Sequence, residues 1–158
     1  MRSPSILVVE DDPEFAILLR EAFRETSSAT QLYVAPNGAA ALEFLEQASE
    51  SAEPPCPDLI LLDLHLPGLD GKGVLQEIKA RGEWQAIPVI IFTGSGNPRE
   101  IAKCYELGAS DFITKPPDYY ALLEIVHNLA AAWLPDPEAA APEPRTVRSG
   151  QGSPTELN

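Results

Sequence analysis

Residues 6–15 read ILVVEDDPEF, and the character of this stretch changes in its middle. Four aliphatic residues come first, as expected of a strand that is covered on both faces of a sheet. Three carboxylates follow at once, Glu10, Asp11 and Asp12, and Pro13 then fits the first turn of a helix that Asp12 would cap. The stretch predicts a buried strand that leads directly into a helix, with negative charge concentrated where the strand ends.

The same strand–helix pattern recurs four more times along the chain. Helical spacing of apolar residues follows each apolar run, and the first case is the set Phe15, Leu18, Leu19, Ala22 and Phe23. We expect strands at 5–9, 31–35, 58–63, 87–94 and 110–114. Strands that alternate with helices form parallel sheets through right-handed crossovers. The expected fold is α/β, a five-stranded doubly wound parallel sheet with helices on both faces, over residues 4–134.

The end of the chain has a different composition. From Pro135 it reads PDPEAAAPEPRTVRSGQGSPTELN, without the apolar periodicity that offsets the entropy of chain ordering. We expect residues 135–158 to be a disordered tail rich in Pro, Ala and Glu. No second globular domain is expected there, so any output would pass through the surface of the first domain.

Charge and composition limit the function classes. The 158 residues contain 11 Lys and Arg against 24 Asp and Glu, a formal net charge of −13. Such a chain repels a phosphate backbone, so we expect no nucleic-acid partner. No apolar run approaches the length of a membrane span and no leader pattern is visible, which predicts a cytoplasmic protein without a membrane partner. The two cysteines, Cys56 and Cys104, lack metal-ligand spacing and are expected to be reduced thiols.

Polar residues follow the ends of four expected strands. The first strand is followed by the three carboxylates, and the others by Asp63, Thr93 and Lys115. In open α/β sheets the ligand lies beyond the carboxyl ends of the strands. Clustered carboxylates need a proton or a cation, and carboxylate oxygens select hard ions such as Mg²⁺. Asp63 could then be only a metal ligand, or a nucleophile that becomes an aspartyl phosphate.

Four motifs in this order resemble the receiver domain of two-component response regulators. They are ILVVEDD, PDLILLDLHLPGLDG, IPVIIFTG and GASDFITKP. The resemblance covers the whole expected domain and implies a flavodoxin-like receiver fold. It also implies a phospho-acceptor, phosphorylated on Asp63 by a sensor histidine kinase with Mg²⁺, which assists its own phosphorylation and slow dephosphorylation but is not a turnover enzyme.

The resemblance also distributes roles among the acidic residues. Glu10 and Asp11 inherit the metal-binding pair, with Asp63 as a further ligand and the backbone carbonyl of His65 as another. Asp12 falls one place later, where helix capping is the preferred interpretation over metal binding. The His65 side chain is either a variable loop residue or an influence on the decay of the acyl phosphate.

Two further pairs complete the expected site. Lys115 and the Thr93 hydroxyl would contact the phosphoryl group, and Thr93 with Phe112 would form the switch pair. From the sequence alone Phe112 could equally be an ordinary core aromatic on a short strand. The resemblance implies a cis peptide bond between Lys115 and Pro116, which would aim the ammonium group inward.

A narrower resemblance suggests partners. The segment ASESAEPPCPD, the connection GEWQAIPV and the final helix ending at Trp133 are similar to single-domain regulators paired with bacterial phytochrome kinases. A bacteriophytochrome is therefore one hypothesis for the kinase. Exposed apolar residues such as Tyr119, Tyr120 and Leu123 predict a homodimer through the last two helices, against the alternative of scattered exposed apolar side chains.

Three other classes of protein fit the sequence less well. Phosphatases of the haloacid-dehalogenase type need a second aspartate two residues after the nucleophile, where this chain has His65. A flavodoxin-like electron carrier needs a phosphate-binding loop after the first strand, and EDDPE would repel that phosphate. A receiver-like scaffold that is never phosphorylated would not need Asp63, Thr93 and Lys115 together.

Overall fold

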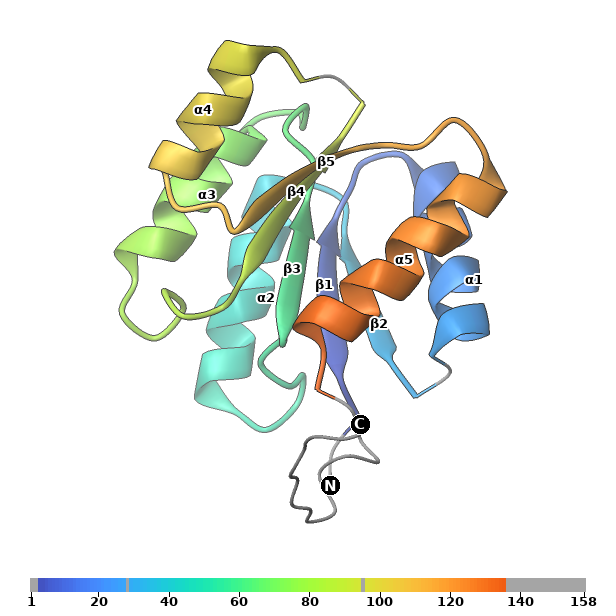
Figure 1. Cartoon of the computed structure of the whole chain (residues 1–158). Helices are drawn as coiled ribbons and strands as arrows, with labels where there is room; N and C mark the ends of the chain where they lie inside the picture. Colours follow the sequence, from blue (N-terminus) through green and yellow to red (C-terminus); the bar gives the residue numbers. More distant parts are fainter. Residues whose placement is uncertain (1–2, 28, 95, 136–158) are drawn as a thin grey trace, which may run out of the picture.

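The computed structural model describes residues 3–27, 29–94 and 96–135. Strands and helices alternate along this part of the chain (Figure 1). Their bounds are β1 (Ser5–Val9), α1 (Pro13–Thr26), β2 (Gln31–Ala35), α2 (Gly38–Glu50), β3 (Leu59–Leu62), α3 (Gly71–Ala80), β4 (Val89–Thr93), α4 (Pro98–Glu106), β5 (Asp111–Thr114) and α5 (Tyr119–Trp133). The expected tail lies, except for Pro135, outside the described residues.

All five strands form one parallel sheet in the order β2-β1-β3-β4-β5. The chain moves outward from β1 to β2, then returns past β1 to β3 and continues to the opposite edge. The direction of winding therefore reverses between β1 and β3, and their carboxyl ends flank the switch point where such sheets bind ligands. The predicted doubly wound α/β fold is confirmed.

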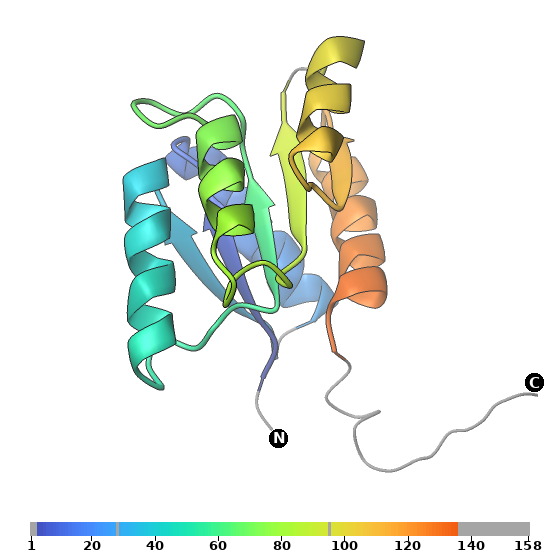
Figure 2. The same cartoon turned by 90° about the vertical axis from the view of Figure 1, so that its left-hand side faces the viewer.

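Helices cover both faces of the sheet (Figures 1 and 2). Successive residues of a strand point to opposite faces, so each strand contributes to two separate apolar cores. On the face covered by α1 and α5, Ile6 and Val8 of β1 join Leu122 and Val126 of α5. On the other face, Leu7, Val9, Ile60 and Leu62 pack with side chains of α2 and α3.

Helix capping explains where the chain leaves the sheet. The side chains of Asp12 and Asp118 accept hydrogen bonds from backbone N–H groups in the first turns of α1 and α5. The Asn97 side chain does the same for α4. Gly108 has φ 111° just after α4, the left-handed conformation expected of a helix-ending glycine. No helix in the described residues has both the length and the apolar character needed to cross a bilayer.

The connection from α3 to β4 contains a packing feature that the spacing of apolar residues does not predict. Trp84 is buried, and its indole N–H donates a hydrogen bond of 2.9 Å to the Ser49 hydroxyl on α2. The guanidinium of Arg81 lies 4.1 Å from the centre of the indole ring. These contacts fix the end of the molecule opposite to the carboxyl ends of the strands.

Candidate functional site

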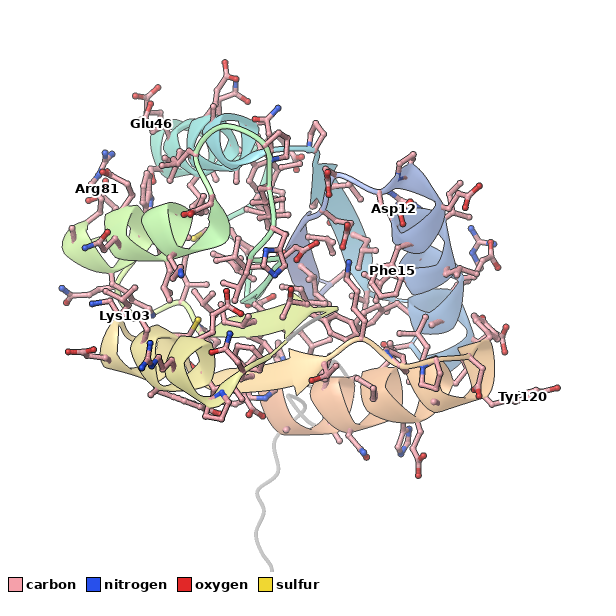
Figure 3. The ribbon with its side chains drawn as sticks, turned by 90° about the horizontal axis from the view of Figure 1, so that it is seen from above. Asp12, Phe15, Glu46, Arg81, Lys103 and Tyr120 are labelled. Carbon is pink, nitrogen blue, oxygen red and sulfur yellow. The ribbon has the colours of Figure 1, made fainter. Side chains whose placement is uncertain are left out.

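The expected site residues meet where the strands end, at the edge viewed in Figure 3. Backbone hydrogen bonds extend the sheet one residue past three strands. Glu10 N donates to Ala35 O at 3.0 Å, and Asp63 N donates to Val9 O at 3.1 Å. Lys115 N donates to Thr93 O at 2.7 Å. Sheet pairing therefore holds Glu10, Asp63 and Lys115 at neighbouring positions.

Asp63 lies at the centre of this group and is only 6% exposed. Its Oδ1 accepts hydrogen bonds from the Thr93 hydroxyl at 2.9 Å and from the His65 backbone N–H at 3.2 Å. Its Oδ2 accepts from the Lys115 ammonium at 3.1 Å. Together these donors fix the orientation of the carboxylate.

Three carboxylates form an acidic cluster. One oxygen each of Glu10, Asp11 and Asp63 lies within 4.8 Å of the others, and Asp11 is exposed while the other two are buried. Oxygen ligands of this kind suit hard divalent cations. Burial raises the pKa of the Glu10 carboxyl, an effect that the hydrogen bond from Lys115 opposes. The donor set fits a divalent metal ion, with Asp11 on the exposed side of the cluster.

Lys115 joins the two buried carboxylates. Its ammonium lies 2.8 Å from Glu10 Oε1 and 3.1 Å from Asp63 Oδ2. Burial by itself would lower the pKa of Lys115, but the hydrogen bonds and charges of Glu10 and Asp63 outweigh it and raise the pKa. The lysine is therefore a fixed positive charge at the inner side of the acidic cluster.

The predicted cis bond between Lys115 and Pro116 is wrong. Among the described residues only the Glu53–Pro54 bond is cis. The backbone bond from Lys115 N to Thr93 O already directs the lysine toward Asp63, and the long side chain spans the remaining distance. A cis isomer is not needed to bring the ammonium group inward.

Asp12 has the position of a capping residue. Its Oδ1 accepts hydrogen bonds from Glu14 N at 3.0 Å and Phe15 N at 3.4 Å. Its backbone N–H donates to Glu10 Oε2 at 3.1 Å, which orients that buried carboxylate. Figure 3 shows Asp12 at the beginning of α1. Of the three successive acids, only Glu10 and Asp11 belong to the acidic cluster.

The other two expected residues are Phe112 and His65. The Phe112 ring is half-buried and lies so close to Gly96 that a Cβ atom there would be 2.8 Å from Phe112 Cε1. His65 is exposed, and its backbone N–H donates the 3.2 Å hydrogen bond to Asp63 Oδ1. The structure thus brings Thr93 to Asp63 and leaves Phe112 on the next strand, against the loop that follows β4.

Sequence reasoning missed one contributor to the site. Phe15 was expected only to line the inward face of α1, but its ring centre lies 4.5 Å from the Lys115 ammonium. The ring also packs edge-on against Phe92, with centroids 5.5 Å apart. An aromatic residue in the first turn after the acidic run was the only available signal, because apolar spacing does not tell which residues lie above the site.

Comparisons with known proteins agree with this geometry. A family model described as the response regulator receiver domain matches residues 6–127. The response regulator Rcp1 of Synechocystis sp. is 36% identical over 129 residues, which cover 82% of this chain and 88% of Rcp1.

Several solved structures are similar to this one. The phosphorylated cyanobacterial phytochrome response regulator RcpA has a TM-score of 0.77 at 33% identity, covering 86% of this chain and 100% of RcpA. The Mn²⁺-bound form of Rcp1 has a TM-score of 0.74 at 36% identity, covering 83% and 94%. The bacteriophytochrome response regulator AtBRR has a TM-score of 0.67 at 31% identity, covering 84% and 96%.

Proposed function

This chain belongs to the response regulator receiver family, and from that membership we propose that Asp63 accepts a phosphoryl group from the phosphohistidine of a sensor kinase, with Mg²⁺ as the cofactor. The observation that carries this assignment is the environment of Asp63. Its carboxylate is buried at the switch point of the sheet, between the Thr93 hydroxyl and the Lys115 ammonium and beside two further carboxylates.

The proposed chemistry is a single phosphoryl transfer. A carboxylate oxygen of Asp63 attacks phosphorus, the bond from phosphorus to the kinase imidazole nitrogen breaks, and the imidazole is left neutral after taking up a proton. Lys115 and Thr93, which donate hydrogen bonds to Asp63, would donate to phosphoryl oxygens during the transfer, where charge stabilisation counts most. A Mg²⁺ ion held by Glu10, Asp11, Asp63 and the His65 carbonyl would neutralise phosphoryl charge.

Release of the phosphoryl group is proposed to be slow and to need only water. Gly94 follows Thr93, and a Cβ atom at that position would meet no other atom within 4 Å, so this side of the site is open. No second carboxylate stands at position 65 to act as a general acid. These features favour a phospho-acceptor over a phosphatase with rapid turnover.

Intact-mass measurement tests the central assignment. Treatment with acetyl phosphate and Mg²⁺ should add one phosphoryl group to the wild type and none to Asp63→Asn. Release of inorganic phosphate should not exceed the amount explained by slow decay of that adduct. An adduct that persists in Asp63→Asn would contradict the assignment, and rapid multiple turnover would favour the phosphatase class.

The metal assignment has a matched pair of neighbouring acids. Asp11→Asn removes a charged oxygen from the acidic cluster, while Asp12→Asn leaves a residue that also caps helices well. Calorimetric titration with Mg²⁺ should show affinity reduced about tenfold or more in Asp11→Asn, as for loss of one charged ligand contact of about 1.4 kcal/mol. Equal losses in both variants would contradict the assigned ligand set.

Phosphorylation is proposed to change the surface of α4, β5 and α5 through Thr93 and Phe112. Tyr120 at the start of α5 is 84% exposed, and Figure 3 shows it projecting away from the molecule. A groove of about 320 Å³ lies between β5 and α5, lined in part by Ile113, Ile125 and Trp133. We assign this surface to a homodimer. Sedimentation is measured before and after phosphorylation and should show a dimer that Ile125→Asp abolishes. A protein that stays monomeric under both conditions would contradict the homodimer.

The proposed kinase is a bacteriophytochrome. The support is that relatives such as RcpA and AtBRR are described as phytochrome response regulators. Phosphotransfer assays with purified kinases should give faster labelling of Asp63 from a bacteriophytochrome kinase than from an unrelated sensor kinase. The reverse preference would reject this partner.

A further inference from the structure

We infer that Phe15 is a positioning residue for the phosphoryl-transfer site, and that the face of its ring holds the Lys115 ammonium in the orientation the reaction needs. This inference rests on the proposed role of Asp63 and Lys115. It adds a residue of α1 whose side chain is apolar and which acts on the acidic cluster only through Lys115.

The first step is the geometry of the ammonium group. Lys115 has three N–H donors, and two of them are directed to Glu10 Oε1 at 2.8 Å and Asp63 Oδ2 at 3.1 Å. The Phe15 ring centre lies 4.5 Å from the same nitrogen, well within the range of cation–π attraction. The ring therefore occupies a side of the ammonium that would otherwise be available to water.

The second step is that the ring itself is held in place from two directions. Phe92, which directly precedes Thr93 on β4, packs against it edge-on at an interplanar angle of 70°. At the backbone, Phe15 N donates to Asp12 Oδ1 in the first turn of α1. Figure 3 shows Phe15 on the side of α1 that faces the strands. Helix capping by Asp12 and aromatic packing by Phe92 together aim the ring at Lys115.

The third step is the consequence for chemistry. Only 19% of the Lys115 side chain is exposed, so its interaction with the ring is partly desolvated and stronger than at an open surface. A lysine side chain is flexible and loses much rotamer freedom when it is fixed. A ring that restricts the ammonium before the phosphoryl group arrives reduces the entropy that the transfer step would otherwise lose.

Graded fluorination of the ring separates this electrostatic role from simple packing. Phe15 is replaced by mono-, di- and trifluorophenylalanine, which keep the ring nearly the same size but progressively weaken its negative face. The rate of Asp63 labelling by acetyl phosphate at saturating Mg²⁺ is measured by intact mass. We expect the rate to fall stepwise along the series, and Phe15→Leu to lose about three- to tenfold.

Two controls accompany the series. The same fluorinated residues at Phe23, buried on the same helix, should leave the rate unchanged because no contact links that ring to Lys115. Phe15→Tyr keeps an electron-rich ring and should retain a rate within about twofold of the wild type. A flat rate along the Phe15 series would overturn the inference, because a packing role alone would give that result.

A second measurement does not depend on phosphorylation. In the unphosphorylated protein, the ε-methylene resonance of Lys115 should be displaced by the ring current of Phe15 and should return to its ordinary position in Phe15→Leu. Failure of the wild type to become labelled would contradict the proposed function. The lysine resonance would still show whether Phe15 contacts Lys115. An unperturbed resonance in the wild type would overturn the inference even if Asp63 is phosphorylated normally.

Discussion

The Thr93 hydroxyl donates a hydrogen bond of 2.9 Å to Asp63 Oδ1, so the proposed switch residue directly contacts the proposed phospho-acceptor. The backbone carbonyl of Thr93 accepts a bond of 2.7 Å from Lys115 N. Thr93 therefore connects β4 with both Asp63 and Lys115. A displacement of its side chain toward a new phosphoryl oxygen would be transmitted directly to the end of β5.

Thr93→Val should separate phosphorylation from its structural consequence. The change replaces the hydroxyl by a methyl group at a site with no solvent exposure, where water cannot take over as donor. Loss of the bond should lower the free energy of unfolding by about 1 kcal/mol. Asp63 should still become labelled, but amide resonances of α4 and β5 should respond weakly to labelling.

Thr93→Ser is the matched control because it keeps the donor. It should preserve the response of α4 and β5, measured by heteronuclear NMR before and after labelling. A full response in Thr93→Val would show that the hydroxyl is not part of the switch.

Gly71→Ala should disturb Asp63 without removing any polar side chain. A Cβ atom at Gly71 would overlap the Asp63 carbonyl oxygen and lie 2.6 Å from Leu64 Cα, because Gly71 N donates a 3.0 Å bond to Leu64 O. The backbone after β3 would have to move. We expect a loss of about 1–3 kcal/mol in the free energy of unfolding, typical of overpacking, together with weaker Mg²⁺ binding.

Gly82→Ala provides the comparison, since a Cβ atom there would meet nothing within 4 Å. Chemical unfolding and Mg²⁺ titration of both variants would check the expectation. Similar behaviour of the two alanine variants would mean that the close approach at Gly71 is not required.

The elements of this fold could be predicted because their signals are local. Asp12, Asn97 and Asp118 each precede a helix and have side chains that accept from its first N–H groups. Continuous apolar runs marked the buried strands, and the rule that parallel strands end at one edge predicted that Asp63 and Lys115 lie close together.

The remaining features depend on distances across the fold. The contact between Phe15 and Lys115 joins residues that lie far apart in the sequence, and the periodicity of α1 carries no information about it. Burial of Trp84 against Ser49 likewise depends on where the connection after α3 crosses α2. The cis bond expected at Pro116 came from resemblance alone, and no local property of the sequence supported it.

Gly96→Ala should displace the aromatic ring of the proposed switch pair. The added Cβ atom would lie 2.8 Å from Phe112 Cε1 and 3.2 Å from Cζ, closer than carbon atoms pack. The ring would have to leave its present position, while Asp63 and its donors are unchanged. A fluorine label at Phe112 should report a different environment in this variant both before and after phosphorylation.

Gly94→Ala tests whether the effect is specific to that contact, because a Cβ atom at Gly94 would point into open space. Its fluorine resonance should match that of the glycine form before phosphorylation. If Gly96→Ala also left the resonance unchanged, Phe112 would not depend on Gly96 for its position.

The hydrogen bond from Tyr119 on α5 to Glu25 on α1 should be lost at high pH. Its phenol donates a 2.7 Å hydrogen bond to Glu25 Oε2, which raises the pKa of Tyr119 to about 12. The folded protein holds this proton more tightly than the unfolded chain, whose tyrosines titrate near 10. The stabilising contribution is therefore complete below pH 10 and is lost as the pH rises through about 12.

Phenolate absorbance should show a step near pH 12 that Tyr119→Phe removes and that Glu25→Gln moves toward lower pH. Tyr120→Phe alters the adjacent, exposed ring and should leave that step in place. Loss of the step in Tyr120→Phe would show that it belongs to Tyr120 and not to Tyr119.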